Sequence, residues 1–143
     1  MIIAHTLEQY QENNVVLGNR EENYNNMYNY YIQLKYFEDF VSLNSLALIL
    51  PIKNMILLSM YKYTKINFKA NNNIELIKNI KTIEESLLMR VDKIPKLSLY
   101  SILLKGNIRV PLQECTNKIV ILRIYGIWES HDYCGLKYKF MVY

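Results

Sequence analysis

The residues that could do chemistry are scattered along the chain. Acidic pairs occur at positions 21–22, 38–39 and 84–85. Adjacent residues on a helix or a strand point away from each other, so none of these pairs is placed to act as a catalytic dyad. The four glycines form neither a phosphate-binding loop nor a nucleophile elbow. We therefore expect no enzyme, no catalytic residue and no cofactor.

Potential metal ligands gather only near His131. Asp132 and Cys134 follow it closely, and Cys115 or His5 could supply a further ligand. Structural zinc sites usually show closely paired ligands at both ends of the site, and that spacing is missing here. The sequence therefore predicts a solvent-exposed loop at His131 rather than a metal site.

The cysteines and the apolar segments bear on the compartment. A bond between Cys115 and Cys134 is conceivable, but the first residues lack the basic and apolar regions of a secretory signal. We therefore expect reduced thiols and an intracellular protein, in the nucleus or cytoplasm of a host if it is viral. The most apolar stretch, 46–58, is interrupted by Pro51 and Lys53 and is shorter than the about 20 residues of a spanning helix, so no membrane span is expected.

Charge is distributed unevenly along the 143 residues. Residues 1–50 hold two basic and six acidic side chains, a net charge of −4. Residues 51–143 hold fifteen basic and seven acidic side chains, a net charge of +8. Such asymmetry favours a polyanion partner for the basic part. A second interpretation is that the acidic segment matches the basic body within one molecule.

The length predicts a single domain over 1–143, with any loosely ordered segment confined to the acidic residues 1–26. A capping-box pattern at residues 6–9 predicts a short helix over 6–13, and residues 18–26 indicate a polar loop. Alternation or apolar runs predict strands over the ranges 28–36, 43–51, 55–69 (one strand or two), 108–112, 118–128 and 136–143. Residues 97–104 are expected to be a short strand or a turn.

The main helix is predicted over about 73–90. Asn73 suits the N-cap and Glu75 the first turn. Apolar residues recur at helical spacing at Leu76, Ile77, Ile80, Ile83, Leu87 and Leu88. The charges of this helix pair at spacings of three and four, so it is expected to brace the fold rather than to contact a ligand.

Three predicted strands each have one face that mixes cations with aromatic rings. In the range 55–69, one parity is apolar and expected inward: Ile56, Leu58, Met60, Ile66 and Phe68. The other parity carries Tyr61, Tyr63, Lys65 and Lys69. In the C-terminal hairpin the even positions are apolar and the odd positions carry Arg123, Tyr125, Lys137 and Lys139. Trp128, the only tryptophan, is either a core or rim anchor or a stacking residue.

Single-stranded nucleic acid fits this pattern. Cations follow the phosphates, and aromatic faces stack on bases for roughly 1–3 kcal/mol each. The candidate phosphate contacts are Lys65, Lys69, Arg123, Lys137 and Lys139. The candidate stacking residues are Tyr61, Tyr63, Tyr125 and Trp128. The alternative is an ordinary solvated sheet face in a chain rich in lysine and tyrosine.

The C-terminal runs 119–129 (IVILRIYGIWE) and 135–140 (GLKYKF) carry a resemblance to a known group. They resemble the closing hairpin of single-stranded DNA-binding replication proteins from large double-stranded DNA viruses and virus-derived mobile elements. The likeness covers about residues 43–143, with the helix before the hairpin in the expected place. It implies an OB-like core and carries no catalytic residue over to this chain, and the acidic N-terminal segment departs from the pattern.

These observations together predict an α+β fold, an antiparallel sheet or OB-like barrel with one main helix and a C-terminal β-hairpin. The expected function is non-sequence-specific binding of single-stranded DNA in replication or recombination, with RNA and a homo-oligomer left open. The alternative function is a viral accessory module that binds proteins without catalysis.

Overall fold

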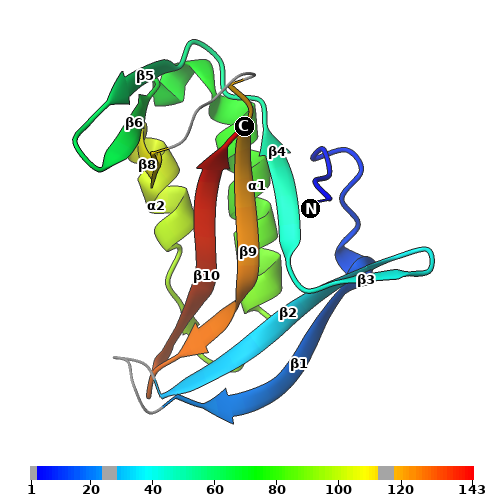
Figure 1. Ribbon diagram of the computed structural model, residues 1–143. Helices are drawn as coiled ribbons and strands as arrows, with labels where there is room; N and C mark the ends of the chain where they lie inside the picture. The colour runs from blue at the N-terminus through cyan, green and yellow to red at the C-terminus, as the bar shows by residue number, and fades with distance from the viewer. Residues whose placement is uncertain (1–2, 24–28, 113–117) are drawn as a thin grey trace.

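The computed structural model describes residues 3–23, 29–112 and 118–143, which form two β-sheets and two α-helices (Figure 1). The larger sheet has seven strands and curls around the longer helix as an open half-barrel, and the smaller sheet has three strands. Almost all strand pairs are antiparallel. The architecture confirms the predicted α+β class, with an antiparallel OB-like sheet, one main helix and a C-terminal hairpin.

That hairpin lies at the centre of the larger sheet. β9 (Val120–Glu129) and β10 (Tyr133–Val142) pair along their length. Two strands share the other edge of β9, because β4 (Leu46–Leu50) pairs with its first half and β2 (Tyr30–Glu38) with its second half. Each of these four strands was expected from the sequence, within a few residues at its ends.

Three further strands complete the larger sheet. β1 (Val15–Glu22) pairs with β2, and β7 (Ile94–Pro95) runs parallel to the start of β10. β3 (Val41–Leu43) returns along the far end of β2. Because β2 pairs with β9 only as far as Gln33, its far end and β3 form a two-stranded arm that projects from the molecule (Figure 1).

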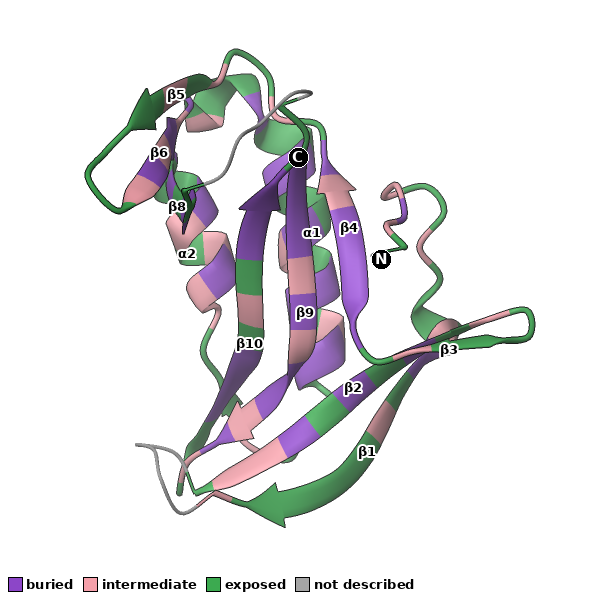
Figure 2. Ribbon diagram, in the orientation of Figure 1, coloured by how far each residue is buried: buried purple, intermediate pink, exposed green. Residues whose placement is uncertain are grey.

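The core lies between the larger sheet and α1 (Ile74–Leu88), where Figure 2 shows the buried residues of both. The apolar positions predicted for this helix are all buried, because residues three and four apart share one face. Asn73 precedes the helix as expected, but its side chain does not cap it. The amide instead accepts from the Lys53 N–H (2.7 Å) and donates to the carbonyls of Lys53 (3.2 Å) and Lys69 (3.0 Å).

The second helix, α2 (Ser98–Lys105), was not predicted, and the expectation of a strand or turn over 97–104 is wrong. Its cap comes from another element. The fully buried Glu84 carboxylate of α1 accepts the N–H groups of Leu99 (3.0 Å) and Tyr100 (2.9 Å) in the first turn of α2. Gly106 ends the helix with a left-handed backbone, φ 68°.

The smaller sheet contains β5 (Ile56–Ser59), β6 (Tyr63–Asn67) and β8 (Asn107–Pro111) in that order. The range 55–69 is therefore two strands of a hairpin. Ile66 and Phe68 are buried as predicted. The inward prediction is wrong for Ile56, Leu58 and Met60, which are 42–61 % exposed. The reason is the turn between the strands, which places Leu57 opposite Ile66 and so reverses the parity of β5.

The N-terminal segment differs from the helix predicted over 6–13 and from the polar loop predicted over 18–26. Residues 6–13 form a single turn, with the reciprocal Thr6–Gln9 hydrogen bonds of a capping box (2.9 and 3.2 Å), and then the 3₁₀ helix η1 (Glu12–Asn14). Two features explain why no longer helix forms. Backbone hydrogen bonds between His5 and β4 hold the segment against the sheet. A helix of only two turns is also marginally stable on its own.

The polar loop predicted over 18–26 is wrong as far as residue 22, because β1 continues through Glu22. The polar side chains of this range face solvent on an edge strand, and a register irregularity between Leu17 and Arg20 lies within it. Residues 24–26 lie outside the described residues. A second 3₁₀ helix, η2 (Ala70–Asn72), leads into α1.

Candidate nucleic-acid interface

One face of the larger sheet is covered by neither helix. Figure 1 shows α1 behind the sheet and α2 beside β10, so that neither helix crosses the face toward the viewer. Register and alternation place side chains of β2, β9 and β10 together on this face. We call this surface the open face. Its basic and aromatic residues are Tyr31, Lys35, Arg123, Tyr125, Trp128, Lys137 and Lys139.

A β-bulge decides which side chains of β9 belong to the open face. The register between β9 and β10 shifts at Tyr125, which is one extra residue in β9. Ile124 before the bulge and Ile127 after it are both fully buried on the core face. An inserted residue reverses the alternation beyond it. Trp128 therefore lies on the same face as Tyr125, although the two differ in sequence parity.

Gly126 lets a tyrosine of β2 lie across the bulge. The Tyr31 hydroxyl donates to the carbonyl of Tyr125 (3.1 Å). A Cβ atom at Gly126 would lie 2.6 Å from the Tyr31 hydroxyl oxygen and 2.2 Å from the carbonyl oxygen of Ile32. On the solvent side, the Lys137 ammonium stands 5.1 Å from the centre of the Tyr31 ring.

Arg123 is oriented by a neighbouring strand connection. Its Nε donates to the hydroxyl of the buried Ser45 (2.7 Å), which uses one of the five guanidinium donors. The guanidinium carbon lies 4.9 Å from the centre of the Tyr125 ring. Lys139 lies directly across the strand pair from Arg123. Two cations and one aromatic ring therefore meet at the middle of the open face.

Trp128 lies across its cross-strand partner Gly135. A Cβ atom at Gly135 would be 2.4 Å from the indole ring, so the ring rests on the backbone of β10. The side chain is half-buried. The indole therefore packs against β10 on one side and belongs to the open face on the other, and its stacking on a base stays a prediction.

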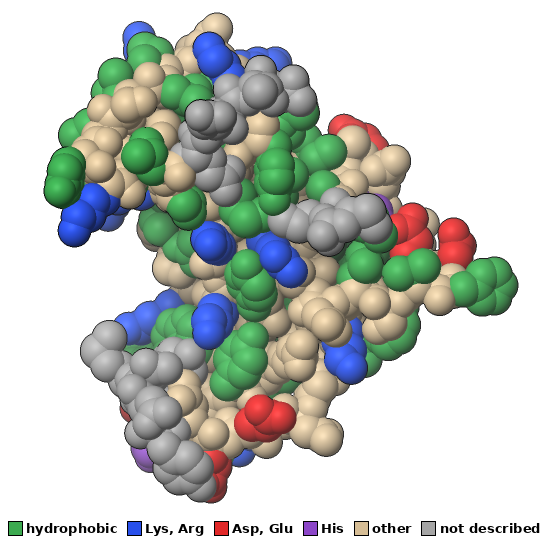
Figure 3. Space-filling view, in the orientation of Figure 1, with side chains coloured by type: hydrophobic (Ala, Val, Ile, Leu, Met, Phe, Trp, Pro, Cys, Tyr) green, Lys and Arg blue, Asp and Glu red, His purple; other side chains and the backbone are tan. Residues whose placement is uncertain are grey.

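Lysine and arginine side chains stand among hydrophobic ones across the middle of this view (Figure 3). Lys35, Lys137 and Lys139 are exposed, and Arg123 and Tyr125 are half-buried. The β1 edge contributes an acid, since Glu21 lies opposite Tyr31. The open face is thus cationic over β9 and β10 and becomes mixed toward β1.

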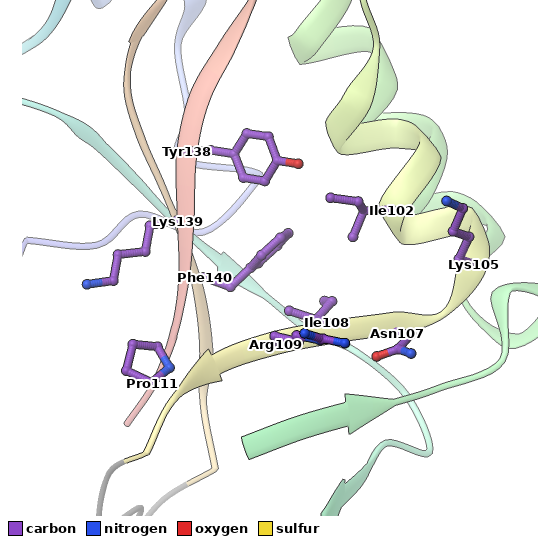
Figure 4. Close-up of a pocket in the computed structure, with 9 residues that line it drawn as sticks. All are labelled: Ile102, Lys105, Asn107, Ile108, Arg109, Pro111, Tyr138, Lys139 and Phe140. Atoms are coloured by element: carbon purple, nitrogen blue, oxygen red, sulfur yellow. The ribbon is translucent and has the colours of Figure 1, made fainter. Parts of the chain in front are cut away.

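A cleft of about 650 Å³ lies between β10, α2 and β8. Its lining residues are Ile102, Lys105, Asn107, Ile108, Arg109, Pro111, Tyr138, Lys139 and Phe140. Three of them are cations, and the described lining contains no carboxylate. Figure 4 shows Tyr138 and Phe140 directed from β10 toward Ile102 of α2, with Lys139 on the opposite side of the strand. Burial raises the pKa of Tyr138 above its ordinary value, opposed by a hydrogen bond with Ser98.

This cleft connects the open face with part of the smaller sheet. Arg109 lies opposite Lys65 in the register, and its guanidinium is 4.8 Å from the centre of the Tyr63 ring. Tyr63 and Lys65 are not part of the cleft lining, but each is the cross-strand partner of a lining residue, Pro111 and Arg109.

The other two residues selected on the smaller sheet lie elsewhere. Tyr61 is 89 % exposed at the β5–β6 turn, with the Lys62 ammonium 5.6 Å from its ring centre. Lys69 follows β6 and lines a separate pocket with Asn54 and Ile56. The structure does not bring Tyr61 or Lys69 to the cleft lining or the open face.

Sequence reasoning missed Tyr31, Lys35, Lys105 and Arg109. The first two occupy the outward parity of a strand that was predicted, so the alternation signal was available for them. Lys105 and Arg109 gave no such signal, because their positions depend on α2 and on its docking against β10.

The ligands considered for zinc do not converge among the described residues. His131 is exposed, 3.0 Å from Asp132, whereas Cys134 is fully buried. Burial raises the pKa of the Cys134 thiol, with Glu129 adding to the effect and Lys93 opposing it. Cys115, named as a disulfide partner or further ligand, lies outside the described residues.

No helix within the described residues is both long and apolar enough to cross a membrane. No protein-family model, curated protein or solved structure matches the chain. The features of the chain that bear on function are therefore the charges and aromatic rings of the open face.

Proposed function

We propose that the open face binds single-stranded nucleic acid, in the first instance DNA, without sequence specificity. The observation that carries this proposal is the bulge at Tyr125, which adds Trp128 to the cations and tyrosines on the face of the larger sheet that neither helix covers. Such a protein would act in DNA replication or recombination, in the viral or virus-derived setting that the sequence resembles.

Each part of the open face has a role in this proposal. Arg123, Lys137 and Lys139 would contact phosphates, since single-strand affinity comes largely from cations that displace counterions. Tyr125 and Trp128 would stack on bases, which every base permits because each has a π face. The Tyr31 side chain is oriented by the hydrogen bond from its hydroxyl to the Tyr125 carbonyl and by the Lys137 ammonium near its ring. It would add a preformed aromatic surface.

The cleft extends the same surface. Arg109 and Lys139 would follow the backbone of a strand that leaves the open face toward Tyr63 and Lys65. The uneven charge of the chain fits this path, because the basic residues 51–143 supply β8, β9 and β10.

The test is fluorescence anisotropy of labelled oligo-dT across a salt series, with wild type and the double variant Lys137→Gln, Lys139→Gln. Each phosphate contact on a single strand contributes a slope of about −0.7 to the dependence of log affinity on log salt. Loss of two contacts should weaken binding at low salt and flatten the slope by about 1.4.

The matched control is Lys53→Gln, Lys78→Gln, which removes the same charge from exposed lysines on the α1 side of the molecule. This variant should bind oligo-dT with nearly the wild-type dependence of log affinity on log salt, because it lowers the net charge without removing a phosphate contact. Equal losses in the two double variants, or a salt-independent wild type, would refute a specific role for the open face.

A second candidate function is a protein-interaction module. The apolar outer face of β5 favours it, since Ile56 and Leu58 are exposed beside the protruding Tyr61. Large apolar residues on a sheet edge are typical of protein contacts. A purified partner that binds independently of salt, together with no binding of oligo-dT, would support this function over the first.

A further inference from the structure

The arm formed by the end of β2 and by β3 presents an apolar tip next to acidic groups. Phe40 is fully exposed, and Phe37 and Val41 are 42 % and 48 % exposed. Glu38 and Asp39 precede Phe40, and Asp39 adopts a left-handed backbone (φ 49°) at the turn. A partner that covers an exposed Phe side chain removes its apolar surface from water, which favours binding.

The arm is held firmly at its base. β3 pairs with β2 from Tyr36 to Glu38, and the Glu38 carboxylate contacts the imidazole of the buried His5. The Tyr36 ring packs against His5 (5.0 Å between ring centres) and against Tyr10 (6.2 Å). Because its base is anchored in the core, the arm presents Phe40 at a defined position, which lowers the entropy lost on docking.

The cleft between β10, α2 and β8 has the complementary character. Ile102, Tyr138 and Phe140 give it an apolar wall (Figure 4). Lys105, Arg109 and Lys139 add positive charge. Its volume of about 650 Å³ lies within the range of about 300–1,000 Å³ typical of binding sites for compact groups.

We infer that the Phe40 arm of one copy of this chain docks into the cationic cleft of a second copy. Phe40 would fill the apolar part of the cleft, and Asp39, the acid at the tip beside it, would face Lys105 and Arg109, because Glu38 is engaged with His5 at the base of the arm. The negative charge of Asp39 also disfavours contact between the tip of the arm and nucleic-acid phosphates. Charge and hydrophobic complementarity therefore both select a second copy as the occupant.

The two surfaces lie on opposite sides of the β9–β10 hairpin, with the arm on the right and β8 and α2 on the left in Figure 1. An arm anchored this way fits the cleft of another molecule rather than its own. Because the arm and the cleft are different surfaces, two copies can exchange arms reciprocally about a two-fold axis, or the contact can repeat into a ring or an open filament.

The inference is independent of the proposed nucleic-acid function and is tested without nucleic acid. Light scattering coupled to size-exclusion chromatography should show a wild-type mass that rises above one chain as concentration increases. Phe40→Asp, which disables the arm, and Arg109→Glu, which disables the cleft, should each remain monomeric. Circular dichroism checks folding, and Lys105→Glu replaces Arg109→Glu if that variant misfolds.

The decisive sample is an equimolar mixture of the two variants. The intact arm of the Arg109→Glu protein can enter the intact cleft of the Phe40→Asp protein. The altered arm of Phe40→Asp and the altered cleft of Arg109→Glu cannot make a second contact. The mixture should therefore form a species of two chains and nothing larger. Met89→Asp, an equivalent change at an exposed residue after α1, should assemble like wild type.

A wild type that stays monomeric at every concentration would overturn the inference. So would a mixture that contains only single chains, variants that still assemble, or a Met89→Asp protein that loses assembly as well. A failure of oligo-dT binding would leave all of these results unaffected.

Discussion

At the scale of single residues, two glycines shape the open face. Gly126 accommodates the Tyr31 side chain over the bulge, and Gly135 accommodates the Trp128 indole. In both cases a cross-strand aromatic ring occupies the volume that a Cβ atom would take. The aromatic rings are therefore fixed by backbone contact before any ligand arrives.

The Gly126→Ala variant tests this arrangement. The new Cβ atom would meet the Ile32 carbonyl oxygen at 2.2 Å, and overpacking of this kind costs about 1–3 kcal/mol. We expect the free energy of unfolding in urea to fall by that amount. Gly18→Ala is the control, because its Cβ atom would come no closer than 3.4 Å to the Gln33 carbonyl oxygen. Equal stability of the two variants would contradict the tight packing at Gly126.

At the scale of elements, α2 depends on a carboxylate from α1. Burial raises the pKa of Glu84 above its ordinary value of 4.5, and the N–H groups of Tyr100 and Leu99 work in the opposite direction. A carboxyl whose pKa is higher in the folded state binds its proton more tightly there. Its contribution to stability is complete below the unfolded pKa and is lost as pH rises through the folded pKa.

We therefore expect the free energy of unfolding of wild type to decline above about pH 4.5 relative to that of Glu84→Gln, which cannot titrate. Urea unfolding of both proteins from acidic to neutral pH measures the difference. A difference that stays constant with pH would show that the carboxyl titrates normally and is not desolvated by folding.

The elements also show what the sequence can reveal. Alternation orients β2 and β10 correctly, because one face of each strand is in the core and the other in solvent. Alternation does not hold beyond Tyr125, because the bulge there shifts the parity of the following residues and nothing in the local composition marks it. It fails in β5 because the turn position was unknown. The α2 helix is missed because its cap, Glu84, is distant in sequence.

At the scale of the whole molecule, three surfaces bear on the two proposals. The open face lies in the middle, the cationic cleft borders it on one side, and the acidic, apolar arm projects from the other (Figures 1 and 3). The uneven charge of the sequence predicted a polyanion partner for the basic residues 51–143. The acids of the arm belong to the acidic residues 1–50. The sequence alone could not show that Lys139 stands where the open face meets the cleft.

The most direct test of the central claim uses the single tryptophan of the chain, Trp128, as a reporter within the open face. Titration with oligo-dT should change the fluorescence of Trp128 in a saturable way that added salt reverses. The change should require much more oligonucleotide in Lys137→Gln, Lys139→Gln than in wild type. Oligo-dT that produces no binding signal, or that binds by anisotropy while the Trp128 fluorescence stays unchanged, would contradict the account.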